Sequence, residues 1–155
     1  MTKLPIKPEP SLRERALGYL SRREYSYQEL QQKLRGYAEE QDDLPGLLED
    51  LKKRGWLSEE RYTEQIVHAR KAKFGSLRVA HELREHGVAE ELVAKAVAEV
   101  KNDEVANARA ICRKKFDAPP QNREQWAKQA RFLQGRGFSF EVIKQVLKDD
   151  PDETI

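Results

Sequence analysis

The sequence predicts an all-α protein of tandem three-helix, helix-turn-helix-like repeats that together form an elongated, curved body. Apolar residues recur at helical spacing along almost the whole chain, and no alternating run indicates a strand. A glycine-containing junction that ends helices recurs along the chain. Charged residues make up 36% and apolar residues 38% of the 155 residues. That balance suits a thin, repetitive body better than one thick core.

Nine helices are expected in chain order, after an irregular, proline-containing arm over residues 1–10. Ser11 and Glu14 match a capping box that starts the first helix. Asn122 and Gln125 match a second one, after a pair of prolines, at the eighth helix. The predicted helices cover residues 12–23, 27–38, 43–54, 59–74, 77–86, 90–101, 104–116, 123–136 and 140–149.

The junction between helices repeats with similar residues at fixed offsets. Gly55, Gly87 and Gly137 each occupy the position where a left-handed backbone ends a helix. In a Schellman motif, the residue after this glycine contacts the residue four positions before it. Apolar residues fill both positions in Leu51/Trp56, Leu83/Val88 and Leu133/Phe138, and Leu20/Tyr25 repeats the spacing with Glu24 in place of glycine. The aromatic members of these pairs are therefore expected in the core.

These junctions divide the chain into three units of three helices. We expect a flexible N-terminal arm over residues 1–10, helical repeats over 11–57, 58–102 and 103–149, and an acidic tail over 150–155. The spacing of the copies is irregular, so an ordinary helical bundle with glycine helix stops is the alternative.

Composition and motifs argue against several classes of protein. The single cysteine, Cys112, leaves no disulfide framework, and its position on an apolar stripe predicts a buried structural thiol. Histidines at metal-ligand spacing and glycine-rich phosphate loops are both missing from the sequence. We therefore expect no catalytic residues, no metal site and no cofactor. Without a long apolar run or a secretion signal, a cytoplasmic protein without membrane contact is expected.

The net charge of only +2 conceals segregated basic segments. The stretch between Glu64 and Glu82 contains four bases and no acid, and residues 109–136 contain eight bases and two acids. Lys and Arg neutralise phosphates without reading sequence, so these segments indicate nucleic-acid or filament contact, with solvated helix faces as the alternative. The candidates are Arg70, Lys71, Lys73, Arg78, Arg113, Lys114, Lys115, Arg131 and Arg136. Internal ion pairs are a further alternative for Arg131 and Arg136.

An acidic segment lies between Arg35 and Lys52, with six acids and no base. Its candidates for contact with a basic protein partner are Glu39, Glu40, Asp42 and Asp43. Asp43 before Pro45 also matches ordinary helix-start chemistry, and we favour that alternative.

Three segments in the middle of the chain carry a family resemblance. They are Gly55-Trp-Leu-Ser-Glu-Glu-Arg-Tyr62, Arg70-Lys-Ala-Lys-Phe-Gly-Ser-Leu-Arg78 and Leu83-Arg-Glu-His-Gly-Val88. Together with Ser26-Tyr-Gln-Glu-Leu-Gln-Gln-Lys-Leu34 and Lys128-Gln-Ala-Arg-Phe-Leu-Gln-Gly-Arg-Gly-Phe138, their order and spacing resemble the RecX regulators over residues 12–149. Ser76 stands where many members have proline, and we expect it to act as a helix N-cap.

The resemblance implies a regulator without catalysis that binds the RecA recombinase. It would lie in the groove of the RecA–single-stranded-DNA filament and mainly inhibit recombinase activity and filament extension, and so affect DNA repair and the SOS response. Weak, sequence-independent contact with single-stranded DNA and a monomeric state are expected. Two other functions remain open: a helix-turn-helix DNA-binding protein, which the tight junctions favour, and a protein-only helical scaffold.

Overall fold

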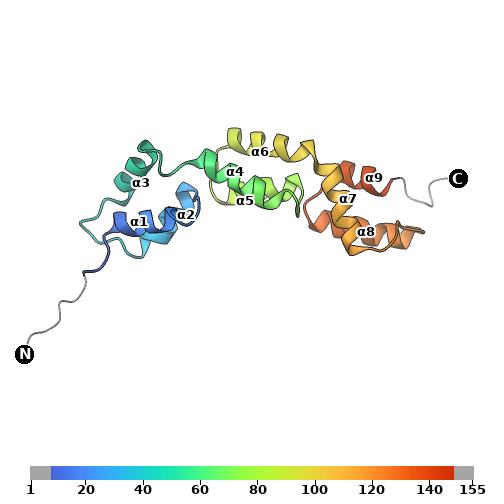
Figure 1. The fold of residues 1–155 in the computed structure, drawn as a ribbon, viewed down its shortest axis with the longest axis horizontal. Coiled ribbons are helices and arrows are strands. Elements are labelled where there is room, and N and C mark those ends of the chain that lie inside the picture. The colour runs from blue at the N-terminus through green and yellow to red at the C-terminus, as the bar shows by residue number, and fades with distance from the viewer. Residues whose placement is uncertain (1–7, 149–155) are drawn as a thin grey trace, which may run out of the picture. The chain divides into compact units, whose positions relative to one another are not determined.

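The computed structural model describes residues 8–148, and within them the chain is helical with short connections (Figure 1). The helices are α1 (Leu12–Leu20), α2 (Tyr27–Arg35), α3 (Leu44–Lys53), α4 (Glu59–Arg70), α5 (Ser76–Glu85), α6 (Glu90–Asn102), α7 (Glu104–Lys115), α8 (Arg123–Gly135) and α9 (Phe140–Leu147). The all-α prediction is confirmed, since these described residues form nine helices and no strand. Most of the predicted arm and the whole predicted acidic tail lie outside the described residues.

The chain divides into two compact units, Met1–Glu59 and Glu60–Ile155. The first unit contains α1 to α3 around one hydrophobic core, in which Leu30, Leu34 and Leu48 are fully buried. The second unit contains two cores, one formed by α4 to α6 and one by α7 to α9. The boundaries of the three repeats stay a prediction.

Three helices end as their glycines predict. The backbone φ is +80° at Gly55, +76° at Gly87 and +88° at Gly137, a conformation that only glycine adopts readily. The closing hydrogen bonds run from Trp56 N–H to the Leu51 carbonyl (2.9 Å), from Val88 N–H to that of Leu83 (3.0 Å) and from Phe138 N–H to that of Leu133 (3.2 Å). These are the Schellman bonds that satisfy the last carbonyls of each helix.

Core placement of the aromatic residues at these junctions is confirmed for two of them and wrong for Trp56. Phe138 and Tyr25 are 1% and 5% exposed, whereas Trp56 is 44% exposed. The next residue, Leu57, enters the core of the first unit instead. The indole remains at the surface, where the guanidinium of Arg54 lies 5.4 Å from its ring centre.

The two predicted capping boxes form only in part. Ser11 Oγ and Asn122 Oδ1 accept the expected N–H groups of Glu14 (3.1 Å) and Gln125 (2.9 Å). The return bonds differ, because the Glu14 carboxylate accepts the Ser11 hydroxyl and Gln125 accepts the N–H of Gln121. Each helix start is thus capped once by its N-cap side chain.

The two cores of the second unit meet through a contact between two turns. The turn between α4 and α5 lies against the turn between α8 and α9, where Gly75 N–H donates to the Arg136 carbonyl (2.8 Å) and Leu77 N–H to the Gly137 carbonyl (3.1 Å). A Cβ atom on Gly75 would overlap the Gly137 carbonyl, and one on Gly137 would overlap Arg78. Glycine is therefore required on both sides of this backbone-to-backbone contact.

A buried carboxylate reinforces the same contact. Glu104, at the start of α7, is only 2% exposed and accepts both the N–H (2.9 Å) and the hydroxyl (3.0 Å) of Ser76. A negative charge at the start of α5 is favourable there because it faces the positive end of the helix dipole. The expectation that Ser76 is the N-cap is wrong, since the N-cap is Gly75 and Ser76 is the first helical residue.

We expect Gly137→Ala to destabilise the second unit by at least about 1 kcal/mol, because its Cβ meets both a left-handed backbone and Arg78. Gly135→Ala is the matched control, because a Cβ there contacts nothing within 4 Å. The control should be neutral or stabilising by up to about 1 kcal/mol, as for any helical Gly→Ala change. Urea unfolding followed by Trp126 fluorescence in a Trp56→Phe chain measures both, and equal midpoints would contradict this packing.

The stability of the first unit should depend on the ionisation of Glu59. Burial raises the pKa of Glu59, although its Oε1 accepts the N–H of Tyr27 at 2.6 Å. Its contribution to stability is therefore present below the ordinary carboxyl pKa and is lost as the pH rises through the raised pKa. Because Glu59→Gln keeps an acceptor and cannot ionise, its stability relative to the parent should improve from about pH 4 to about pH 7.

Urea unfolding followed by Trp56 fluorescence in a Trp126→Phe chain measures this difference. A stability difference between Glu59→Gln and its parent that stays constant over this range would show that burial does not control the carboxyl group.

Candidate nucleic-acid interface

Basic side chains of the second unit lie against aromatic rings in a continuous row. The guanidinium carbons of Arg78 and Arg136 lie 4.2 Å and 5.4 Å from the ring centre of Phe74. Arg136 lies 5.4 Å from the ring centre of Phe132 as well, and the ammonium of Lys115 lies 5.9 Å from that ring. We call Arg78, Phe74, Arg136, Phe132 and Lys115 the cation–aromatic row.

The row is assembled from segments that are far apart in the sequence. Phe74 belongs to the turn after α4, Arg78 to α5, Lys115 to the end of α7, and Phe132 and Arg136 to the end of α8. Their proximity depends on the contact between the two glycine turns, which brings the end of α8 to the start of α5.

In the part of the chain that the structure describes, no carboxylate compensates the cations of the row. Within residues 8–148, Arg78, Arg136 and Lys115 form no ion pair with a carboxylate. The polar partners of the two arginines are neutral carbonyls, of Gly135 for Arg78 (3.3 Å) and of Lys73 for Arg136 (3.5 Å). Carbonyls and ring faces hold these cations in place without neutralising them.

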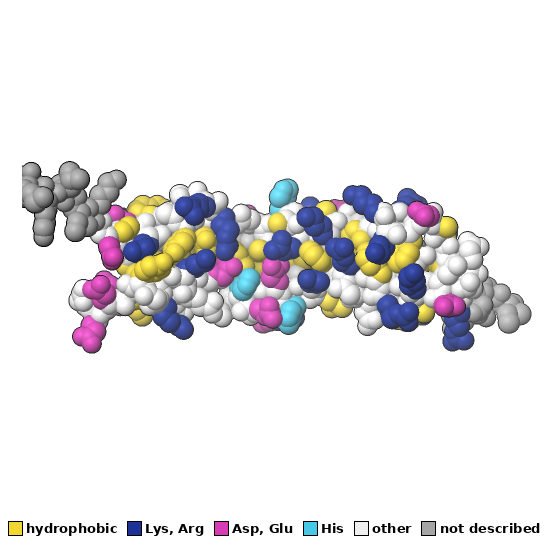
Figure 2. Space-filling model, turned by 90° about the horizontal axis from the view of Figure 1, so that it is seen from below, with side chains coloured by type: hydrophobic (Ala, Val, Ile, Leu, Met, Phe, Trp, Pro, Cys, Tyr) yellow, Lys and Arg dark blue, Asp and Glu magenta, His cyan; other side chains and the backbone are white. Residues whose placement is uncertain are grey.

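The other basic candidates differ from one another in how exposed they are. Lys73, Arg113, Lys114 and Arg131 are exposed and Lys71 is half-buried; none is ion-paired within the described residues. On the face of the second unit seen in Figure 2, Lys and Arg side chains are interleaved with hydrophobic ones.

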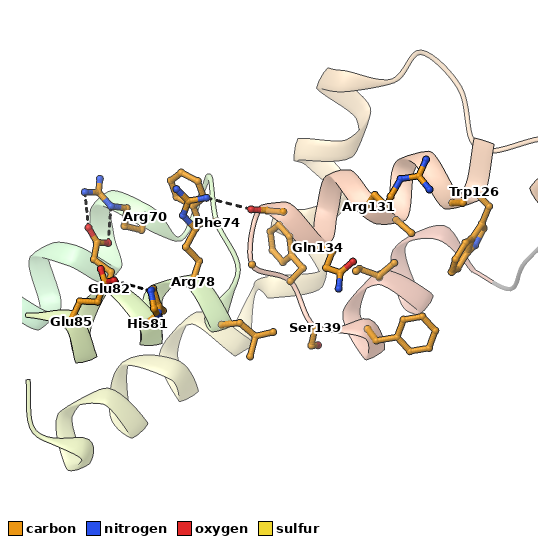
Figure 3. A pocket seen from close by; sticks show the side chains of 18 residues that line it. Arg70, Phe74, Arg78, His81, Glu82, Glu85, Trp126, Arg131, Gln134 and Ser139 are labelled. Carbon is orange, nitrogen blue, oxygen red and sulfur yellow. Dashed lines mark hydrogen bonds and ion pairs between the residues drawn. The ribbon is translucent and has the colours of Figure 1, made fainter. Parts of the chain in front are cut away.

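Arg70 is the exception among the basic candidates. Its Nε and Nη2 donate to the two carboxylate oxygens of Glu82 at 3.0 Å and 3.1 Å (Figure 3). This two-point bond with Glu82 raises the pKa of Arg70 and compensates its charge.

A groove of about 980 Å³ lies beside the row, between the α4–α5 segment and the α8–α9 segment (Figure 3). Arg78 and Arg131 line it, together with the ring of Trp126. It also exposes two large apolar side chains, Leu77 (58% exposed) and Phe140 (60% exposed). Large apolar side chains with this exposure beside a concave surface are typical of interaction sites.

The sequence did not predict a role in this region for several of its residues. Phe74, Phe132, Leu77 and Trp126 were not among the candidates named from the sequence. A signal for the two phenylalanines does exist in the sequence, because each arginine of the row follows its phenylalanine by four residues: Phe74/Arg78 and Phe132/Arg136. Residues four apart share a helix face, so this spacing can stack a guanidinium on a ring for Phe132 and Arg136 at the end of α8, whereas Phe74 lies in the turn before α5.

The acidic candidates of the first unit lie in the connection between α2 and α3. Asp43 is the N-cap of α3 and accepts the N–H of Gly46 (3.1 Å), and Asp42 accepts the N–H of Glu39 (2.9 Å). Glu39 accepts an amide hydrogen of Gln41 (2.7 Å), while Glu40 is exposed. Two of the four carboxylates thus serve the local backbone.

Two further features bear on chemistry. Cys112 is 6% exposed, burial raises the pKa of its thiol, and its Sγ lies 3.4 Å from Gln129 Oε1, so it is a buried thiol. Over residues 8–148, no three His, Cys, Asp or Glu side chains are grouped as metal ligands, and no helix has the length and apolar character to span a membrane.

The sequence matches two models of one family. The model of the second three-helix domain of RecX matches residues 58–97, and that of the third matches residues 102–147. Two similar relatives are both named regulatory protein RecX. That of Herbaspirillum seropedicae is 44% identical over 151 residues (94% of this chain, 98% of the relative), and that of Neisseria gonorrhoeae 37% over 148 residues (96% of each).

Solved structures agree in fold. The crystal structure of RecX from Lactobacillus salivarius superposes with a TM-score of 0.77 at 19% identity, covering 88% of this chain and 92% of that one. A second RecX crystal structure superposes with a TM-score of 0.76, also at 19% identity, and the match covers 89% of this chain and 72% of that one. With the helix order, the family models and the relatives in agreement, the chain belongs to the RecX family, whose curated relatives are named regulatory proteins.

Proposed function

We propose that this protein binds the filament that the RecA recombinase forms on single-stranded DNA and inhibits its activity and extension. The cation–aromatic row carries the proposal, because it presents uncompensated positive charge at fixed positions next to a groove with apolar side chains. Membership of the RecX regulators supports the recombinase as the partner. On this proposal the protein acts in the cytoplasm as a monomer and affects DNA repair and the SOS response.

The physical basis is phosphate recognition without base recognition. Cations that are not ion-paired attract phosphates and release the counterions around the strand, and this gain does not depend on the base sequence. The ring faces and carbonyls that hold Arg78 and Arg136 restrict these side chains before DNA arrives. Less side-chain freedom is then lost on binding.

Direct DNA binding should nevertheless be weak. The cation–aromatic row itself has three cations, and the net charge of the chain is only +2. Tight binding to the filament arises when contacts with DNA and with protein act together, because the second contact then forms at high effective concentration.

Charge reversal at the end of α7 should weaken inhibition. Arg113→Glu/Lys115→Glu reverses two exposed cations, and we expect it to raise the concentration that half-inhibits RecA-driven ATP hydrolysis on single-stranded DNA at least tenfold. Lys95→Glu/Lys101→Glu, which changes the net charge equally on α6 of the same unit, should inhibit like the natural protein.

The outcomes of this titration separate three functions. Absence of inhibition by the natural protein at every ratio would refute the proposed function. Full inhibition by Arg113→Glu/Lys115→Glu, without any DNA binding, would favour a protein-only scaffold. Tight binding to one duplex sequence at about 200 mM salt would favour a helix-turn-helix DNA-binding protein.

Salt dependence reports the number of phosphates contacted. For single strands, the slope of log K against log salt concentration is about −0.7 per neutralised phosphate. We expect Lys115→Ala to reduce the slope for a fluorescent oligothymidine by about 0.7 and Lys95→Ala to leave it unchanged, as measured by anisotropy. Equal slopes for the two variants would show that Lys115 does not contact the phosphates of the strand.

A further inference from the structure

The groove beside the cation–aromatic row has features that phosphate binding does not require. Its exposed apolar side chains, Leu77 and Phe140, come from α5 and α9, and Trp126 of α8 lines it as well. Leu77 is aliphatic and offers no planar face for stacking on a base. Leucine and aromatic rings in one concave surface instead match the apolar side of a protein segment.

The charges at the groove are biased toward positive. Of its two carboxylates, Glu82 is paired with Arg70 in a two-point bond, and Glu85 lies 3.0 Å from the imidazole of His81 (Figure 3). Arg131 and Arg78 form no ion pair with any residue of the described part of the chain. A ligand therefore meets the charges of two arginines against one carboxylate, that of Glu85.

We propose that this groove binds an acidic, amphipathic segment of a protein partner. The apolar side chains of the segment would pack on Leu77, Phe140 and Trp126, and its carboxylates would pair with Arg131 and Arg78. This is the helix-in-groove mode of recognition, with charge complementarity selecting acidic over basic segments. The inference deepens the proposed function by giving the chemistry of the protein contact.

The groove contains its own spectroscopic probe. Trp126 lines it, and its indole N–H donates to the Lys148 carbonyl (3.2 Å), which holds the ring in place. The other tryptophan, Trp56, lies in the first unit. In the full-length Trp56→Phe chain, a change in tryptophan fluorescence therefore reports binding at the groove.

The test uses three blocked synthetic peptides of about 14 residues, or about four helical turns. One has leucines along one helix face and glutamates elsewhere, the second has lysines in place of the glutamates, and the third scrambles the first. We expect the acidic amphipathic peptide to change the Trp126 fluorescence with saturation. The lysine and scrambled peptides should bind at least tenfold more weakly.

Variants then locate the binding site. Leu77→Asp and Phe140→Asp, at side chains exposed enough to leave folding intact, should each weaken binding of the acidic peptide at least tenfold. Arg131→Glu should weaken binding of the acidic peptide and strengthen binding of the lysine peptide. Lys128 is an exposed residue on the same helix outside the groove. Lys128→Glu is therefore the matched control and should leave the affinities for the acidic and the lysine peptide unchanged.

Each other outcome overturns the proposal. Equal binding of the acidic and lysine peptides, insensitivity to Leu77→Asp, or no binding of any peptide would do so. Displacement of the acidic peptide by oligothymidine, with fluorescence insensitive to Leu77→Asp, would identify the groove as a nucleic-acid site instead. Inhibition of RecA-driven ATP hydrolysis is measured separately, so loss of peptide binding with retained inhibition rejects only this inference.

Discussion

The second unit depends on one contact between two turns, in which backbone meets backbone because neither side carries a Cβ atom. Gly75 and Gly137 lie face to face, and the N–H groups at the start of α5 donate to carbonyls at the end of α8. Buried Glu104 completes this arrangement by accepting the N–H and hydroxyl of Ser76. This contact fixes how the two hydrophobic cores of the unit are joined.

That geometry gives the surface its electrostatic character. Arg136 reaches the rings of both Phe74 and Phe132 because the two turns touch, and Arg78 stacks on Phe74 from the other segment. Cations held by rings and carbonyls stay charged, whereas the two-point bond between Arg70 and Glu82 removes one cation from the set. The neighbouring groove adds exposed apolar area, so one face combines the chemistry of phosphate binding with that of protein binding.

Local features were predictable from the sequence and the contacts between distant segments were not. The helix stops at Gly55, Gly87 and Gly137 follow from residue type and offset, because a left-handed backbone is a local requirement. The sequence did not predict the ion pair between Arg70 and Glu82, because twelve positions and a turn separate the two residues. Trp56 was misplaced because the Schellman spacing sets the backbone but leaves the direction of a large side chain to its surroundings.

The most direct test of the account is to observe the arginine side chains while single-stranded DNA binds. In an NMR titration of the full chain with oligothymidine, the Nε–H signals of Arg78 and Arg136 should shift with saturation and return as salt is added. The Nε–H signal of Arg84, which is bonded to Glu90 at 2.7 Å in the same unit, should stay unchanged. Unchanged Arg78 and Arg136 signals at saturating DNA would contradict the assignment of the cation–aromatic row as the nucleic-acid interface.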